Sequence, residues 1–323
     1  MSEPDEIYVD ARGPRRPSRL ARLWPAGRAL FAWPGLRLLR PLTRRVLEVA
    51  EPAGRLSLRS CPPITVEHPG DHLTVLSANL WHDWPRYRRW TERLEALAQL
   101  AETERADLVL LQEVARTRRL HADEWLAQRL AMAHVYSRAN GHAAAIGFEE
   151  GLAVLSRFPL SAVRLRQLGA GRNPFVRRLA LGAEAETPFG PVLAISVHLG
   201  LRSGRNAVQL TELRAWVGAV ADGRPVVVGG DFNAPEHRAQ IRHTQRLWLD
   251  TFRHLHPHAD GTTHELRWPW GGLLRRHRLD YVFVVSPGDR WQVRETQHVD
   301  APGGPHSDHR AVLTRITPAP AGA

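Results

Sequence analysis

The feature that most limits the fold of this chain is a series of short apolar runs, each about as long as a β-strand. They begin at Leu73, and clear examples span residues 73–80, 107–113, 191–198 and 225–230. Apolar runs of this length, bounded by turn residues or by helical periodicity, are typical of buried strands. We therefore expect the chain from about Leu73 onward to be a folded domain built on β-sheets.

The order of the runs indicates the kind of sheet. A helical period over residues 87–105 separates the first two runs, so the domain opens as β-α-β. Later runs follow one another with only turns between them, which favours antiparallel neighbours. We expect these strands at residues 143–148, 151–156, 162–168, 176–185 and 191–198, and three more at 279–285, 291–297 and 310–316.

Further helices are expected over residues 120–132, 206–220 and 235–248. Helices at both ends of a strand-rich middle favour two packed sheets over a doubly wound sheet of the Rossmann type. The predicted fold class is α/β: a four-layer α/β sandwich in which two mostly antiparallel sheets pack face to face with helices outside. We expect residues 61–323 to form this single domain.

Residues 1–60 differ from the rest of the chain in charge. They hold 12 arginines against 6 acidic residues, whereas residues 61–323 hold 32 against 27. Between Ala11 and Leu47 there are ten arginines, five prolines and no acidic residue, and so many prolines disfavour a packed helix. We expect residues 1–60 to be a disordered basic arm, with residues 11–47 as a candidate contact for an anionic membrane surface or nucleic acid.

The arm has no segment able to cross a bilayer. Its best apolar stretch, residues 29–39, is interrupted by Pro34 and Arg37 and falls short of the roughly 20 residues that a transmembrane helix needs. No clear secretory signal, with a continuous apolar region and a cleavage site, is present. We expect a cytoplasmic protein, peripheral to the membrane if the arm contacts lipid, and a monomer; no protein partner is inferred.

Composition excludes several chemistries. Cys61 is the only cysteine, so neither a disulfide framework nor a cysteine-rich zinc site can form. All 44 residues counted as lysine or arginine are arginine, which excludes a lysine Schiff base and a Walker-type phosphate lysine. The 17 histidines leave other metal and acid–base chemistry open.

Polar residues stand where the apolar runs end, and they form the candidate site. Burying any one of them beside a strand without a partner would cost several kcal/mol, so they must contact one another, a ligand or solvent. Singly, each has an ordinary explanation as a turn former, a helix N-cap or a buried histidine. Together they supply oxygen ligands suited to Mg²⁺ or Mn²⁺ and histidines able to move protons. They are Asn79, Glu113, His198, Asp231, Asn233, Asp280, Asp308 and His309.

The motifs around these residues resemble those of the endonuclease/exonuclease/phosphatase superfamily, which has the deoxyribonuclease-I-like fold. The resemblance covers residues 73–316 and rests on six motifs in the order of the family. They are Asn-Leu-Trp, Gln-Glu, Val-His-Leu, Gly-Asp-Phe-Asn, Arg-Leu-Asp-Tyr and Ser-Asp-His. The resemblance implies a hydrolase that cleaves phosphate esters with one or two Mg²⁺ ions, Mn²⁺ being the alternative.

The resemblance also implies which residues bind metal and which act on water. The implied metal ligands are Asn79, Glu113 and Asp308. Asp231 and Asn233 resemble the pair that orients or deprotonates the attacking water and holds a phosphate oxygen. Whether Asp231 or His309 takes the proton of that water stays open.

Two catalytic histidines are implied as well. His309 resembles the histidine at the scissile phosphate, and Asp280 the carboxylate that fixes its tautomer and supports its positive charge. His198 resembles the second catalytic histidine of the deoxyribonuclease-like and sphingomyelinase-like branches. We expect Glu150 to be the catalytic carboxylate partner of His198, with the adjacent Glu149 as the alternative.

The substrate class is left between nucleic acid and lipid. Nucleic acid is favoured, for an endonuclease or an exonuclease, because arginine contacts to phosphates dominate non-specific affinity for it. The alternative is a membrane-surface lipid phosphodiesterase, sphingomyelinase-like, or a phosphoinositide phosphatase. A non-catalytic binding protein is disfavoured by the complete set of motifs.

Residues 264–278 lead directly into Asp280, so we expect them to form a loop at the mouth of the site. Trp268 and Trp270 are expected to stack on bases or to enter a lipid interface, the alternative being that they pack onto the sandwich. The arginines expected to contact a polyanion are Arg267, Arg275, Arg276 and Arg278.

Overall fold

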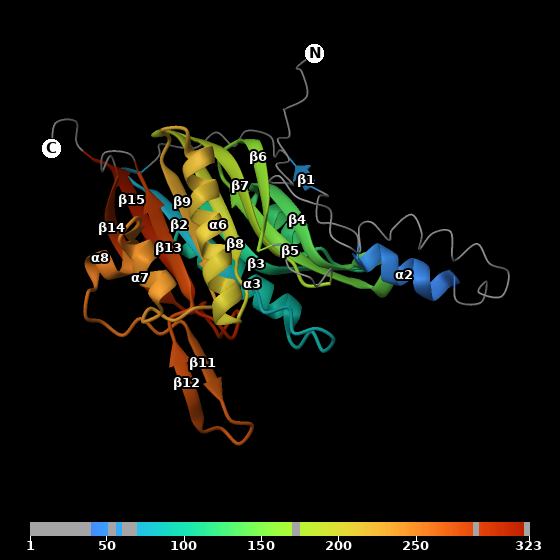
Figure 1. Cartoon of the computed structure of the whole chain (residues 1–323). Helices are drawn as coiled ribbons and strands as arrows, with labels where there is room; N and C mark the ends of the chain where they lie inside the picture. Colours follow the sequence, from blue (N-terminus) through green and yellow to red (C-terminus); the bar gives the residue numbers. More distant parts are fainter. Residues whose placement is uncertain (1–39, 51–55, 60–69, 170–174, 287–290, 320–323) are drawn as a thin grey trace, which may run out of the picture.

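The computed structural model of the chain describes residues 40–50, 56–59, 70–169, 175–286 and 291–319 (Figure 1). Within these residues the strands form two large sheets and one separate two-stranded sheet. The helices are α2 (Arg40–Ala50), α3 (Trp90–Thr103), α4 (Ala122–Leu130), α5 (Ala143–Ile146), α6 (Ser203–Ala221), α7 (Ala239–Gln245) and α8 (Thr251–Leu255).

The larger sheet has seven strands. They are β1 (Leu56–Arg59), β2 (Leu73–Asn79), β3 (Leu108–Thr117), β4 (Ala133–His142), β5 (Phe148–Ser156), β14 (Trp291–Val299) and β15 (Ala311–Pro318). Their order across the sheet is β1-β4-β5-β3-β2-β15-β14. Neighbouring strands are antiparallel except β2 and β3, which are parallel because helix α3 connects them as a crossover.

The other large sheet has six strands. They are β6 (Leu160–Leu168), β7 (Arg178–Thr187), β8 (Gly190–His198), β9 (Val226–Asp231), β10 (Leu249–Asp250) and β13 (Asp280–Val285). Their order is β10-β13-β9-β8-β7-β6, and only β8 and β9, joined through α6, are parallel. Both sheets are therefore mostly antiparallel, as predicted.

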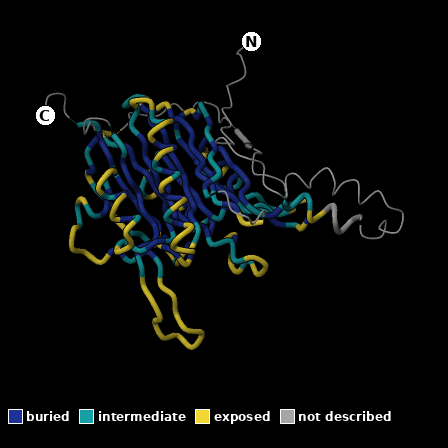
Figure 2. Tube along the Cα trace, in the orientation of Figure 1, coloured by how far each residue is buried: buried dark blue, intermediate teal, exposed yellow. Residues whose placement is uncertain are grey.

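The two sheets pack face to face through an apolar core. Val75 and Leu110 reach it from the seven-stranded sheet, and Ala194 and Val227 reach it from the six-stranded sheet. Because successive side chains of a strand point to opposite faces, the intervening residues form the outer face of each sheet. Central strands such as β2 and β9 are accordingly buried on both sides (Figure 2), whereas the edge strands β6 and β14 are only partly buried.

Helices cover the outer faces of both sheets (Figure 1). Leu94 of α3 and Leu126 of α4 pack on the seven-stranded sheet. Leu213 and Trp216 of α6, with Ile241 of α7, pack on the six-stranded sheet. The order of layers is helix, sheet, sheet, helix, so the predicted four-layer α/β sandwich is confirmed.

The structure differs from the sequence-based expectation between α4 and β5. Strand β4 (Ala133–His142) was not expected, because its many polar residues break the apolar pattern of a buried strand. Residues 143–148 were expected as a strand but contain the short helix α5. The three alanines of α5 favour a helix. At its start the ring of His142 accepts a hydrogen bond from the N–H of Ala145 at 3.2 Å, and at its end Gly147 takes a left-handed conformation with φ of 76°.

Part of the segment expected to be a disordered arm is ordered. Helix α2 tolerates Pro41 because the proline lies in the first turn, where no intrahelical N–H bond is lost. Strand β1 pairs antiparallel with β4, so the seven-stranded sheet begins before residue 61. Residues 1–39 of the predicted arm lie outside the described residues. No helix in the described ranges is both long and apolar enough to span a membrane.

The third sheet is a hairpin of β11 (His264–Arg267) and β12 (Leu273–His277). It stands away from the sandwich (Figure 1), and residues 265–276 are exposed throughout (Figure 2). The chain enters it directly from Thr263 and leaves it toward β13.

Candidate active site

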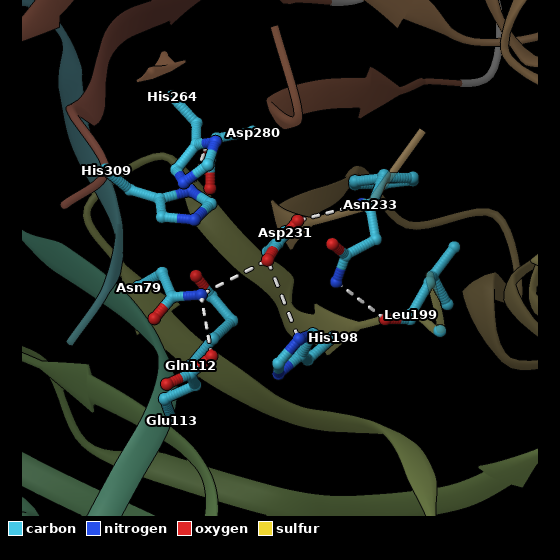
Figure 3. A network of polar contacts seen from close by, with 12 residues as sticks. Asn79, Gln112, Glu113, His198, Leu199, Asp231, Asn233, His264, Asp280 and His309 are labelled. Carbon is cyan, nitrogen blue, oxygen red and sulfur yellow. Dashed lines mark hydrogen bonds and ion pairs between the residues drawn. The ribbon is translucent and has the colours of Figure 1, made fainter. Parts of the chain in front are cut away.

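The candidate site lies where the facing sides of the two sheets reach the ends of their strands (Figure 3). In β9, Val227 belongs to the inter-sheet core, and Asp231, four residues further, lies on the same face. Asp231 stands opposite His198 of β8 on one side and opposite Asp280 of β13 on the other. The alternation that builds the core therefore also places three polar side chains side by side at its end.

Two glycines before Asp231 let other chain segments approach closely. A Cβ on Gly229 would lie 2.7 Å from Cδ1 of Leu110 and 3.1 Å from Oγ of Ser77, both in the opposite sheet. A Cβ on Gly230 would overlap the carbonyl oxygen of Val197 in the neighbouring strand. A side chain at either position would force the sheets or strands apart just below the site.

One amide links carboxylates of the two sheets. Nδ2 of Asn79, at the end of β2, is 3.4 Å from Oε1 of Glu113 and 3.2 Å from Oδ2 of Asp231. Glu113 lies at a β-bulge in β3 and has a φ of 51°. Bulges re-aim side chains, and a left-handed non-glycine residue carries strain that is common at functional sites. Nε2 of His198 is 3.5 Å from the same oxygen of Asp231.

The second oxygen of Asp231 is held by the next turn of chain. The backbone N–H of Asn233 donates to Oδ1 of Asp231 at 2.8 Å, and Nδ2 of Asn233 donates to the carbonyl oxygen of Leu199 at 2.9 Å. Asn233 has a left-handed backbone with φ of 48°, which asparagine tolerates better than most residues. Both carboxylate oxygens of Asp231 therefore have fixed directions.

His309 and Asp280 form a close pair. Nδ1 of His309 is 2.8 Å from Oδ2 of Asp280, and the hydroxyl of Thr263 donates to the same oxygen at 2.6 Å. An ionised carboxylate only accepts, so Nδ1 of His309 carries the proton and Nε2 is left for another partner. Burial opposes a charge on His309, but the attraction of Asp280 outweighs it and raises the pKa of His309 to about 10.

Two carboxyl groups of the site, those of Asp231 and Glu113, have raised pKa values. Burial, and then repulsion by Asp280, raise the pKa of Asp231 to about 6. Burial, and then repulsion by Glu150, raise the pKa of Glu113, and the charges of Asp231 and Asp308 act in the same direction. Such clustered oxygen donors fit a divalent cation, which would relieve this repulsion.

Two groups of side chains have the spacing of metal ligands within the described residues. Asp231, Asp280 and His309 form one group, and His264, Asp308 and His309 form the other, with the ligand atoms of each group within 4.8 Å of one another. Of the ligands expected from the sequence, Asn79 and Glu113 are in contact, whereas Asp308 lies beside His264, with 3.8 Å between Oδ2 and Nε2.

The expected pairing of Glu150 with His198 is not what the structure shows. Glu150 stands opposite Asn140 in the β4–β5 ladder and accepts its amide at 2.5 Å, while the carboxylate beside His198 is that of Asp231. The alternative, Glu149, accepts a backbone N–H of α5 at 3.1 Å. Burial, and then the charge of a nearby arginine, lower the pKa of His198, so it is neutral near pH 7.

Two histidines near the site escaped the sequence reading. Nε2 of His82 is 3.6 Å from Oε2 of Glu113 and 3.9 Å from Oε2 of Glu150. The ring of His264 packs on that of His309 with 4.5 Å between centroids. His82 follows Asn79 by three residues in a loop, and His264 precedes Asp280 across a hairpin. Neither histidine ends an apolar run, which is the pattern that predicted the other site residues.

Comparison with known proteins gives one family. The model of the Endonuclease/Exonuclease/phosphatase family matches residues 76–309, which include every candidate site residue. The uncharacterized protein YbhP of Escherichia coli (strain K12) is 32% identical over 230 residues, covering 66% of this chain and 84% of YbhP. The YbhP of Shigella flexneri matches to the same extent.

Solved structures show the same fold. A family protein from Leptotrichia buccalis aligns with a TM-score of 0.62 and 17% identity, covering 76% of this chain and 99% of its own. D. rerio TDP2 complexed with single strand DNA product aligns at 0.60 and 15% identity, covering 77% and 100%. The human nocturnin catalytic domain with bound sulfate aligns at 0.60 and 19% identity, covering 77% and 95%.

Proposed function

Because the chain belongs to the endonuclease/exonuclease/phosphatase family, we propose that it hydrolyses phosphodiester bonds with a divalent cation, Mg²⁺ or Mn²⁺. The observation that carries the proposal is the convergence of carboxylates from both sheets. Glu113 and Asp231 meet at the amide of Asn79, beside the Asp280–His309 pair. Hydrolysis of a phosphodiester needs charge neutralisation, an oriented water and relief of charge on the leaving oxygen, and this site offers groups for each.

The cation would be held by Glu113, Asn79 and Asp308, which are oxygen donors. When bound, it would neutralise charge on the phosphoryl oxygens and increase the acidity of water. The donor set contains no thiolate, in keeping with a hard cation. The raised pKa of Glu113, caused by burial and by repulsion from Glu150, is the electrostatic environment expected where a cation would bind.

The remaining residues divide the proton transfers between them. Asp231 is placed to take a proton from the attacking water, because its pKa of about 6 lies near neutral pH and both its oxygens are oriented. His309, with a pKa of about 10, is protonated at neutral pH and directs Nε2 away from Asp280. It is suited to stabilise the charged phosphate and the leaving oxygen, while the amide of Asn233 and the neutral His198 supply further hydrogen bonds.

Substitutions test this assignment on a soluble substrate, bis(p-nitrophenyl) phosphate with Mg²⁺. Glu113→Gln, Asp231→Asn and His309→Ala should each lower the rate by at least about a hundredfold. Asp222→Asn and His258→Ala, at exposed positions, serve as matched controls that keep the full rate. Circular dichroism checks that each variant is folded. Activity that survives EDTA, or that survives all three site substitutions, would contradict the proposal.

For the substrate we propose nucleic acid. The support is the arginine content of the chain and its similarity to TDP2 complexed with single strand DNA product. The test compares the rates at which the protein hydrolyses plasmid DNA and single-stranded RNA with its rates on vesicles containing sphingomyelin or a phosphoinositide. Cleavage of the lipids alone would replace nucleic acid by the second candidate, a lipid phosphoester at a membrane surface. The exposed apolar hairpin favours that candidate.

A further inference from the structure

The tip of the β11–β12 hairpin is a continuous apolar surface. The stretch Trp268-Pro-Trp-Gly-Gly-Leu-Leu274 contains no charged side chain and no hydroxyl, amide or carboxyl side chain. All of it is exposed, and it projects from the sandwich (Figures 1 and 2). Proteins that work alone in water rarely expose a contiguous apolar surface without using it for binding.

The indole rings of Trp268 and Trp270 stack on each other. Their rings are 5.0 Å apart at an interplanar angle of 5°, and Trp268 and Trp270 remain 44% and 77% exposed. Leu266, Leu273 and Leu274 are exposed beside them. The alternative, that the tryptophans pack onto the sandwich, is therefore wrong, and nothing in the described part of the chain covers this surface.

Arginines border the apolar tip. Arg267 precedes it, and Arg275 with Arg276 follows it directly, all three exposed. Arg267 pairs with Glu265 at 2.5 Å, whereas Arg275 has no ion-pair partner in the described ranges of the chain. Arg278, which the sequence placed in the same group, is buried against Asp250 and is not available to a ligand.

We propose that this hairpin docks the protein on an anionic lipid bilayer. The apolar tip enters the interfacial region, where tryptophan is favoured, and the arginines lie at the level of the lipid phosphates. The order of residues along the hairpin, apolar at the tip and cationic behind it, matches the order of acyl chain and phosphate in the membrane. The proposal goes beyond the hydrolytic function because it concerns where the enzyme sits.

The geometry fits a membrane better than nucleic acid. Stacking on bases needs open aromatic faces, yet Trp268 and Trp270 occupy one face of each other. The leucines have no role in stacking, whereas all of the apolar side chains gain by leaving water at a lipid interface.

The base of the hairpin is joined to the candidate active site. His264, the first residue of β11, contacts both Asp308 and His309. Thr263, just before it, donates to Asp280, and the backbone N–H of Arg310 donates to the carbonyl oxygen of Thr263 at 2.8 Å. Docking of the tip would therefore set the mouth of the site at a fixed height above the lipid surface.

The test measures insertion with the full chain. Vesicles of equal parts phosphatidylglycerol and phosphatidylcholine carry brominated acyl chains, which quench tryptophans that enter the bilayer. We expect quenching of the unmodified protein and its loss in the variant Trp268→Ala/Trp270→Ala. The matched control is Val208→Ala/Leu247→Ala, which truncates exposed apolar residues elsewhere and should keep the quenching.

A second pair of variants tests the arginines. Arg275→Ala/Arg276→Ala should weaken sedimentation with the same vesicles by at least about tenfold at low salt, whereas Arg242→Ala/Arg246→Ala, also at exposed positions, should have little effect. All four variants should keep the rate on bis(p-nitrophenyl) phosphate, so failure here is separate from failure of the proposed hydrolysis.

Two results would overturn the proposal. One is equal quenching of the unmodified protein and the tryptophan variant, since the quenched residues would then lie elsewhere. The other is loss of binding to a single-stranded DNA oligonucleotide by the tryptophan variant with vesicle binding unchanged, which would make the hairpin a nucleic-acid contact.

Discussion

Replacing Arg278 with methionine should destabilise the domain by about 3–5 kcal/mol, because the change leaves a buried carboxylate without its partner. The guanidinium donates to the two oxygens of Asp250 at 2.6 and 2.9 Å and to Oε1 of Glu236 at 2.7 Å. The side chains of Arg278 and Asp250 are 1% and 4% exposed, so water cannot replace the lost contacts.

The size of the effect follows from the surroundings of Asp250. Burial alone would raise the pKa of Asp250, yet Arg278 holds it below its ordinary value. Without Arg278 the carboxylate must take up a proton or stay charged in an apolar setting. Removing that charge as well, by Asp250→Asn, should restore part of the loss, because asparagine can still cap α8 through the N–H of Arg253.

Urea unfolding followed by circular dichroism at pH 7 measures these differences. The matched control is Arg276→Met: its ion pair with Asp260 spans 3.5 Å between side chains that are 60% and 62% exposed, and its loss should cost no more than about 0.5 kcal/mol. The reasoning fails if Arg278→Met costs no more than this control. It also fails if Asp250→Asn destabilises the Arg278→Met variant as much as it destabilises the unmodified protein.

Two more predictions concern pH and the basic arm. Burial lowers the pKa of His298 to about 3, while an unfolded histidine binds its proton near pH 6.5, so the folded state loses stability as pH falls from about 6.5 toward 3. His298→Leu should remove about 2 kcal/mol of the stability that the folded protein loses between pH 7 and pH 5. Urea midpoints that fall equally with pH in the variant and in the unmodified protein would refute this. Deleting residues 1–39 should weaken binding to anionic vesicles at low salt without changing turnover of bis(p-nitrophenyl) phosphate; unchanged vesicle binding would contradict it.

Site residues at the ends of strands could be predicted because side chains two residues apart share one face of a strand. The face that packs in the core therefore continues into the site. Val75, Ser77 and Asn79 share one face of β2, so a polar residue that continues an apolar face must emerge at the end of the core. Asp231 continues Val227 in the same way. This rule needs only local sequence and accounts for Asn79 and Asp231. Glu113 is out of step with Leu110 and reaches the site through the bulge in β3.

Contacts that depend on register could not be predicted. The partner of Glu150 is decided by which residue of β4 stands opposite it, and β4 itself carries too many polar residues to be recognised as a strand. The sequence likewise does not predict that the hairpin projects from the sandwich, because an apolar stretch such as residues 268–274 is equally consistent with packing on the core. His82 reaches Glu113 from a loop, where no periodicity operates.

The position of Glu113 relative to Asp231 depends on how the two sheets lie against each other. Apolar packing alone tolerates small shifts between sheets, so polar contacts across the core are better able to fix the alignment. Directly below the site, Nε2 of Gln112 donates to Oγ of Ser196 at 3.0 Å, and that hydroxyl donates to the carbonyl oxygen of Leu111 at 2.8 Å. These buried bonds join β3 to β8, and the amide of Asn79 makes a further link above them. The carboxylates of the site are therefore aligned by hydrogen bonds between the sheets.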